Sequence, residues 1–328
     1  MTTPSAYPAK RAAVSESGHR RELAYPEVPE PLPVPCYDNH THLEIEDGDE
    51  DAGYLSVAEH MDRAEAAGIR GAITVGGDVP SSRWAAGAAA LEPRLLAAVA
   101  IHPNEVPRYV ADGSLEEALA EIDALASEPR VRAIGETGLD YFRTTETADQ
   151  RSQMESFEAH IALAKKHGLA MQIHDRDAHD DVVATLKRVG APERTVFHCF
   201  SGDAALARMC ADEGWFCSFA GTVTFKNAEN LREAVDALPL ELILTESDAP
   251  FLTPTPYRGR PNAPYLVPLT VRAIAERRGI SVEECASAIA ATTERVYGSW
   301  DEDAGVVDSG PSDSSGSGPA SLHPARAS

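Results

Sequence analysis

The sequence contains no apolar run long enough to cross a membrane. Of its 328 residues, 43% are hydrophobic and 25% are charged, which is ordinary for a globular protein. No stretch approaches the ~20 consecutive apolar residues that a membrane-spanning helix needs. The first 33 residues are polar and rich in proline, and they lack the apolar segment of a secretory leader. We therefore expect a chain with no membrane association.

Cysteine is also scarce, and its spacing matches no known framework. The five cysteines include no CxxC pair, and their odd number does not suit a set of disulfides. Reduced thiols are typical of a cytoplasmic protein, and we expect that location. These residues are Cys36, Cys199, Cys210, Cys217 and Cys285.

Positive charge is in short supply, because the formal net charge is -23. A negative field of this size repels polyanions at long range and argues against a protein that wraps duplex DNA. A cleft that holds two cations would still attract a phosphate group locally. No GxGxxG motif follows any apolar run, which argues against a dinucleotide-binding fold.

The composition divides the chain into three parts. Residues 34–298 carry the apolar runs and are predicted to form the folded domain. Residues 1–33 and the acidic Ser/Gly-rich residues 299–328 have too few apolar side chains to offset their ordering entropy, and we expect both to be disordered. Within the domain, the acidic run from Glu44 to Asp51 is expected to be a solvated loop.

Short apolar runs alternate with helical patterns throughout the predicted domain. Eight runs of this kind in one domain indicate an α/β fold of the (β/α)₈ TIM-barrel type rather than an open doubly wound sheet. The expected strands are Val34–His42, Ile69–Gly77, Leu95–Pro103, Val131–Leu139, Leu169–Asp175, Thr195–Ser201, Trp215–Thr224 and Leu242–Ala249. The clearest helical segments are Val57–Ala67, Leu115–Leu125, Gln150–His167 and Ala178–Val189.

The first expected strand ends in His40-Thr41-His42. Residues two apart on a strand point to the same side, so both imidazoles leave one face together. By itself this pair is equally compatible with half of a divalent-metal site and with two solvated loop histidines.

Most of the other expected strands also end in residues that bind metals. The carboxyl ends of barrel strands converge on one mouth, where the active sites of such barrels lie. Several imidazoles and carboxylates meeting there predict a binuclear metal centre. The residues in question are His40, His42, His102, Glu136, His174, His198 and Asp248.

The motifs around these residues resemble those of the TatD-type metal-dependent hydrolases, a deoxyribonuclease family in the amidohydrolase-like barrel group. The resemblance extends from about Asp38 to Gly298. It rests on Asp38–Leu43 (DNHTHL), Gly135–Tyr141 (GETGLDY), Ile173–Arg176 (IHDR), His198–Gly202 (HCFSG), Glu246–Phe251 (ESDAPF) and Pro256–Asn262 (PYRGRPN).

The resemblance implies a ligand set for two divalent cations. His40, His42 and Asp248 would hold one cation, and His174 with His198 would hold the second. Glu136 would bridge the two, since a carboxylate can span cations that lie ~3.5–4 Å apart. No lysine ends the fourth strand, so a carbamylated-lysine bridge is not expected. The metal remains open among Mg²⁺, Mn²⁺, Zn²⁺ and Co²⁺.

The chain departs from the family pattern at a few positions without losing a predicted ligand. Ser247 stands before Asp248 where the family commonly has threonine, so a hydroxyl is kept. Ala263 replaces a glutamate of the arginine-glycine segment, and Thr292 takes the place of a usual asparagine near the end of the domain.

The implied reaction is hydrolysis of a phosphodiester in DNA or a related substrate by a water activated by two metals, with a 3'-5' exodeoxyribonuclease as the expected enzyme. Asp248 is the expected proton acceptor, because it lies at the metal edge and needs no large pKa shift. His102 would position the scissile phosphate, or it is a structural strand-end histidine. Arg143 and Arg258 would clamp phosphate, or they are plain surface charges. Glu246 is expected to orient a ligand from outside the metal shell.

Two other classes of function remain open from the sequence. The same centre would serve a metal-dependent ester or amide hydrolase, such as a D-aminoacyl-tRNA deacylase. A non-catalytic scaffold that keeps the barrel is a further alternative, but the complete set of ligand residue types argues against it. The sequence also leaves open whether the chain is a monomer or an oligomer.

Overall fold

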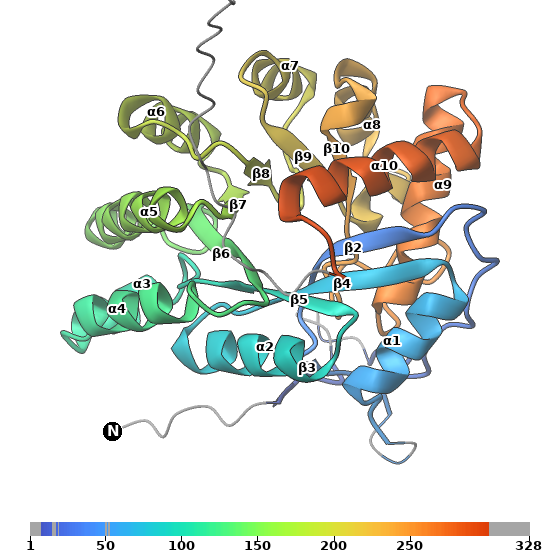
Figure 1. Ribbon diagram of the computed structural model, residues 1–328, viewed down its shortest axis with the longest axis horizontal. Coiled ribbons are helices and arrows are strands. Elements are labelled where there is room, and N and C mark those ends of the chain that lie inside the picture. The colour runs from blue at the N-terminus through green and yellow to red at the C-terminus, as the bar shows by residue number, and fades with distance from the viewer. Residues whose placement is uncertain (1–7, 15–17, 19, 50, 52, 302–328) are drawn as a thin grey trace, which may run out of the picture.

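The computed structural model describes residues 8–14, 18, 20–49, 51 and 53–301, and it confirms the predicted barrel. Eight parallel strands stand side by side in the order β10-β9-β8-β7-β6-β5-β4-β2, with helices around the outside (Figure 1). The strands are β2 (Cys36–Thr41), β4 (Ile69–Val75), β5 (Leu95–Val99), β6 (Val131–Asp140), β7 (Ala170–Arg176), β8 (Thr195–Phe197), β9 (Phe216–Phe219) and β10 (Ile243–Thr245).

The helices between the strands begin and end largely where sequence signals place them. Ser56 and Glu59 form a reciprocal capping box at the first helix, and Asp78 and Ser81 do the same at the second. Gly168 ends α5 in the left-handed conformation, with φ +61°. The helices are α1 (Val57–Ala66), α2 (Val79–Leu91), α3 (Val106–Ala111), α4 (Leu115–Leu125), α5 (Thr147–His167), α6 (His179–Val189), α7 (Ala204–Asp212), α8 (Glu229–Ala237), α9 (Val267–Arg278) and α10 (Val282–Tyr297). Among the described residues, none of the helices has the length and apolar character needed to span a bilayer.

The barrel closes between its first and last strands through a single bridge rather than a ladder. Thr41 and Ala249 form an isolated parallel bridge, and the amide of His42 donates to the Ala249 carbonyl at 2.7 Å. Asp38, buried on β2, accepts hydrogen bonds from the amide and the hydroxyl of Ser247. The hydroxyl kept at position 247 is therefore used to hold the segment after β10 against β2.

Several predicted strands extend further in the sequence than in the structure. The sixth, seventh and eighth runs continue to residues 201, 224 and 249, whereas β8, β9 and β10 stop at Phe197, Phe219 and Thr245. The chain then leaves the sheet as loops, and Gly221–Thr224 forms a 3₁₀ turn. The apolar pattern continues past the strand ends because side chains of these loops are also buried, among them Ala220, Val223 and Ala249.

The expectation of disorder before residue 34 is wrong for the part of that segment that the structure describes. The short strand β1 (Ala9–Lys10) pairs in parallel with β3 (Ile45–Glu46). Farther along, Leu32 is buried, and its amide donates to the carbonyl of Ala67. Residues 1–7, 15–17 and 19 lie outside the described residues. The proline-rich segment has no helix or strand pattern, so nothing in its sequence revealed these contacts.

Arginines on the barrel hold this irregular N-terminal segment through its backbone carbonyls. Arg260 donates to the carbonyls of Ala24 and Tyr25, both at 3.0 Å. Arg272 in α9 donates to the carbonyls of Glu30 and Pro31. At the other end of the domain, the Trp300 ring stacks on Tyr37 at 4.2 Å, and residues 302–328 of the predicted acidic tail lie outside the described residues.

The acidic run after His42 is not the solvated loop that its composition suggested. Asp47 is buried and binds Arg21 through both carboxylate oxygens, at 2.8 and 2.6 Å. Arg11 donates to the same carboxylate at 3.1 Å. Charged residues of the N-terminal segment thus neutralise an acid that would otherwise be costly to bury.

We predict that Asp47→Ala lowers the free energy of unfolding by about 3 kcal/mol, because it leaves two arginines unpaired and the side chain of Arg21 is only 5% exposed. Urea unfolding of the metal-free protein measures the change. Asp49→Ala removes an exposed acid from the same run and should stay within about 0.5 kcal/mol of wild type. Equal stability of the two variants would contradict a structural role for the Asp47 pairs.

Candidate metal centre

The carboxylate of Glu136 on β6 lies between two groups of histidines at the mouth of the barrel. Its Oε2 atom is 3.4 Å from His40 Nε2 and 3.3 Å from His42 Nε2. Its Oε1 atom is 2.8 Å from His174 Nδ1 and 3.2 Å from His198 Nε2. Each oxygen thus faces a different group, which is the arrangement a bridging carboxylate requires.

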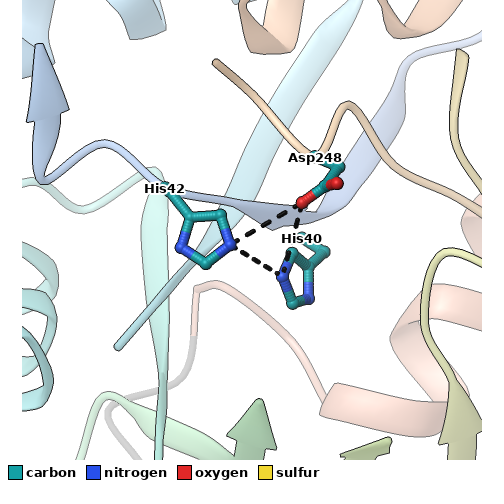
Figure 2. Close-up of side chains that lie close together, drawn as sticks. All are labelled: His40, His42 and Asp248. Carbon is teal, nitrogen blue, oxygen red and sulfur yellow. Dashed lines mark hydrogen bonds and ion pairs between the residues drawn. The ribbon is translucent and has the colours of Figure 1, made fainter. Parts of the chain in front are cut away.

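Asp248 completes the first group from the opposite side. Its Oδ1 atom is 3.6 Å from His42 Nε2 and 3.9 Å from His40 Nε2, and the two histidine nitrogens are 3.3 Å apart (Figure 2). The amide of Asp248 donates to the His40 carbonyl at 3.0 Å, so β2 itself fixes the position of this carboxylate.

These separations suit a cation at the centre of the group. Donors held at about 2.0–2.2 Å around a tetrahedral ion lie roughly 3.3–3.6 Å from one another. The measured spacings among His40, His42, Glu136 and Asp248 run from 3.3 to 3.9 Å. Three sets of residues each bring their donor atoms to within 4.8 Å of one another. These sets are His40, His42 and Asp248; His40, Glu136 and His198; and His102, Glu136 and His174.

In each of four rings, one nitrogen donates a hydrogen bond to a neighbouring oxygen, so the other nitrogen, which faces the centre, presents a lone pair that can bind a cation. The Nδ1 atom of His40 is 3.0 Å from Gln172 Oε1. The amide of Gln172 is fixed in this orientation, because its Nε2 donates to the Asn39 carbonyl, which can only accept. His40 therefore carries its proton on Nδ1 and presents the Nε2 lone pair to the centre.

Three carboxylates fix the remaining rings in the same way. Glu44 lies 3.1 Å from His42 Nδ1, and Glu246 lies 3.2 Å from His198 Nδ1. In His174 the two ring nitrogens exchange roles, since Nε2 lies 3.3 Å from Asp140 Oδ2 and Nδ1 faces Glu136. A carboxylate on the far nitrogen is the usual partner of a metal-binding histidine, because it holds the tautomer and raises the basicity of the ligand.

His102 differs from the other four histidines. Its Nδ1 accepts the amide proton of Asn104 at 3.0 Å, so a neutral ring carries its own proton on Nε2. That Nε2 lies 3.1 Å from Glu136 Oε1 and 3.3 Å from His174 Nδ1. His102 therefore points a donor, rather than a lone pair, into the centre.

The electrostatics of the site follow from its burial. Burial alone would raise the pKa of Glu136, but His198, His102 and His174 outweigh it and hold that pKa well below its usual value. Burial and the neighbouring His198 lower the pKa of His40 to about 4. For His42, burial acts downward, yet Glu44 and Glu136 prevail and raise its pKa. Burial likewise acts to lower the pKa values of His174 and His198, but nearby carboxylates prevail and raise them, so the carboxylates favour protonated rings when no cation is bound. A cation binds the neutral form of an imidazole, so its binding would release these protons.

The expectation of an ordinary pKa for Asp248 is not met. Burial is the main cause that raises its pKa to about 7, with Glu246 and Glu136 adding to it and His198 and His42 opposing it. A cation beside this carboxyl would favour the ionised form again, because an opposite charge lowers a carboxyl pKa.

Two glycines on β6 allow the strands to approach closely enough for this geometry. A Cβ atom at Gly138, where φ is +144°, would collide with the carbonyl of His174 on β7. A Cβ atom at Gly135 would lie 2.6 Å from Cβ of Gln172. Both contacts lie beside Glu136, so β6 and β7 bring the bridge and its partners together only if these positions carry no side chain.

The other predicted site residues lie at the rim. Arg143 and Arg258 are both exposed. The amide of Arg143 donates to Asp140 Oδ1 at 2.8 Å, and the Arg258 guanidinium lies over the Phe225 ring at 4.0 Å. Their predicted role in binding phosphate stays a prediction.

The site also contains residues that the sequence did not single out for it. Gln172 sits within β7, Asp140 ends β6, and Glu44 belongs to the acidic run. The only available signal was spacing. Asp140 lies four residues after Glu136, and Glu44 lies two residues after His42.

We predict that Glu44→Gln weakens metal binding about tenfold, because the amide keeps the size of the side chain but removes the charge beside His42. Competition with a chromogenic chelator measures the dissociation constant. Glu46 lies two residues after Glu44, on β3 and outside the site. The variant Glu46→Gln lacks that charge and should bind metal like wild type. Matching affinities for the two variants would show that Glu44 does not tune the ligand.

Comparison with known proteins places this geometry in context. The family model described as TatD related DNase matches residues 37–298. The chain is 45% identical to a Mycobacterium tuberculosis protein described as an uncharacterized metal-dependent hydrolase, over 80% of this chain and 97% of the relative. A Klebsiella pneumoniae relative described as a 3'-5' ssDNA/RNA exonuclease is 35% identical, over 67% of this chain and 84% of its own length.

A solved structure shows the same architecture. The crystal structure of a TatD homologue from Escherichia coli, YJJV, superposes with a TM-score of 0.71 at 25% identity, covering 80% of this chain and 97% of that one. The relatives described above are matched over most of their length, whereas the first 36 residues of this chain precede the family match.

Proposed function

The chain belongs to the TatD related DNase family and is a metal-dependent hydrolase, and from this premise we propose that it hydrolyses phosphodiester bonds in DNA as a 3'-5' exonuclease. The observation that carries the proposal is the division of the Glu136 carboxylate between two histidine groups. Such a division suits two cations, and two-cation sites are typical of enzymes that cleave phosphate esters.

The proposed ligands are those of the two groups. His40, His42 and Asp248 with Glu136 would hold one cation, and His174 and His198 with Glu136 would hold the other. His174 and His198 fall in different sets of close donor atoms, but both meet the same Glu136 oxygen. Mg²⁺, Mn²⁺, Zn²⁺ and Co²⁺ all accept this mixture of imidazole and carboxylate.

When bound, the cations lower the pKa of water and neutralise negative charge on the phosphoryl oxygens. The chain's own groups do the rest. Asp248 accepts a proton from the attacking water at the oxygen that points away from His40 and His42 (Figure 2). His102 positions the scissile phosphate through a hydrogen bond from its Nε2–H to a phosphate oxygen, since its Nδ1 already accepts the amide of Asn104.

Arg143 and Arg258 are proposed to bind phosphates of the strand outside the centre, where their exposure leaves them accessible. The proposed location is the cytoplasm, supported by five cysteines that are all free thiols. The proposed substrate is a nucleic acid rather than an aminoacyl ester because the exonuclease relative is named for that chemistry.

We predict that Glu136→Gln loses at least one metal per chain and lowers the nuclease rate by ~10²-fold or more, because the amide cannot hold two cations together. Metal content by mass spectrometry and turnover of a labelled oligonucleotide measure both effects. Glu146→Gln changes an exposed residue just before α5 and should match wild type in both measurements. Two metals and full rate in Glu136→Gln would refute the bridge.

A substrate panel tests the reaction itself. We expect single-stranded DNA labelled at its 5' end to be shortened stepwise, and activity to disappear with a chelator and return when divalent metal is added back. D-aminoacyl-tRNA should be left intact under the same conditions. Deacylation without DNA cleavage would support the ester-hydrolase alternative, and inactivity toward both substrates with metal bound would support the scaffold.

A further inference from the structure

Three arginine side chains lie over phenylalanine rings that follow barrel strands. Arg176 lies 3.9 Å from the centroid of Phe142, which comes two residues after β6. Arg258 lies over Phe225 at 4.0 Å, after β9. In the third pair, Arg11 lies 4.9 Å from the centroid of Phe251, which follows β10. All three rings therefore belong to the end of the barrel that carries the candidate metal centre.

The third pair is unlike the others because its arginine does not come from the barrel. Arg11 belongs to the N-terminal segment that precedes the matched residues 37–298, and β1 brings it to the mouth by pairing with β3. Its amide donates to the carbonyl of Glu46 at 2.9 Å. The position of Arg11 is thus fixed by backbone pairing as well as by its side chain.

The side chain of Arg11 is anchored at one nitrogen. Its Nη1 donates to Asp47 Oδ2 at 3.1 Å and to the carbonyl of Pro250. Among the residues that the structure describes, Nε and Nη2 have no recorded hydrogen-bond partner, and the side chain is 24% exposed. A guanidinium held in this way keeps N–H donors available for an incoming anion.

Phe251 links Arg11 to the metal centre. Its ring is 36% exposed and meets the ring of His42 edge to face, with centroids 6.2 Å apart. Arg11 therefore lies one aromatic ring away from a proposed metal ligand. Arg11 and Arg21 share the single carboxylate of Asp47, so this group of three side chains carries a net charge of +1.

We propose that Arg11 forms a phosphate subsite, contributed by the N-terminal segment, for a nucleotide next to the one being cleaved. The proposal rests on the proposed function, because it assumes a substrate with more than one phosphate. Guanidinium groups bind phosphate oxygens through paired N–H donors, and an aromatic ring beneath them is common where proteins bind single strands. The subsite adds affinity for the strand without taking part in bond cleavage.

The test compares two substrates in the metal-loaded enzyme. Arg11→Gln should raise KM for a single-stranded oligonucleotide about tenfold, the effect of losing one hydrogen bond to a charged group, and leave kcat unchanged. Hydrolysis of bis(p-nitrophenyl) phosphate, which has no neighbouring phosphate, should not change. Arg11→Lys keeps the charge and should recover part of the affinity. Arg83→Gln, an exposed arginine on α2, serves as the matched control.

A binding measurement gives a readout that does not depend on turnover. Fluorescence anisotropy with a cleavage-resistant phosphorothioate oligonucleotide gives the dissociation constant at several salt concentrations. The slope of the logarithm of the association constant against the logarithm of the salt concentration should become shallower by about 0.7 in Arg11→Gln, as expected when one phosphate contact on a single strand is lost. Metal content should equal that of wild type, and the thermal midpoint should fall by less than in Asp47→Ala, because Arg21 still pairs with Asp47.

Each other outcome overturns the subsite. An unchanged KM and salt slope in Arg11→Gln would show that Arg11 does not contact the strand. An equal loss on both substrates, or a loss of metal, would show that Arg11 only supports the fold. If the wild-type enzyme neither binds nor cleaves the oligonucleotide, the proposed function itself fails and the subsite fails with it.

Discussion

The buried carboxylate of Glu136 is the constraint on which the rest of the site depends. A charge taken out of water at this depth is costly unless compensating groups surround it. Here the compensation comes from histidines at the ends of β2, β5, β7 and β8, which are far apart in the sequence. Only a closed arrangement of parallel strands brings all of these ends to one point. The barrel and the charge cluster therefore depend on each other.

A second layer of polar groups decides what the histidines do. The oxygens of Gln172, Glu44, Glu246 and Asp140 each accept a hydrogen bond from the N–H of one ring, which directs the opposite lone pair inward. His102 has a backbone amide in that place, so its proton points inward instead. Five similar imidazoles are thereby separated into four potential ligands and one donor by their partners alone. The chemistry of the mouth is set as much by these partners as by the histidines.

Much of this candidate centre could be predicted from the sequence, because the candidate ligands lie at strand ends, and strand ends are marked by the change from apolar to polar residues. The pair His40 and His42 follows from the two-residue period of a strand. Gln172 could not be predicted, since it lies inside a buried strand and reaches His40 across the barrel. The burial of Asp47 within the acidic run could not be predicted either, because it depends on Arg11 and Arg21, which belong to a segment with no secondary-structure pattern. Composition describes how much charge a segment carries, but not what partner it meets.

The nucleic-acid substrate proposed for this strongly acidic chain would approach against a net charge of -23. Several of the acids lie at the mouth, where Glu44, Glu136, Asp140, Glu246 and Asp248 would repel phosphate if no cation were bound. Two divalent cations bring four positive charges to these five carboxylates and neutralise most of the local negative charge, so under the proposed function metal must bind before the strand does. Beyond the cations, screening in salt limits the remaining acids to short range. Arginines at the rim are proposed to act on the strand at distances where the bulk charge of the protein no longer dominates. Arg11, which belongs to the N-terminal segment rather than to the barrel, adds to these arginines.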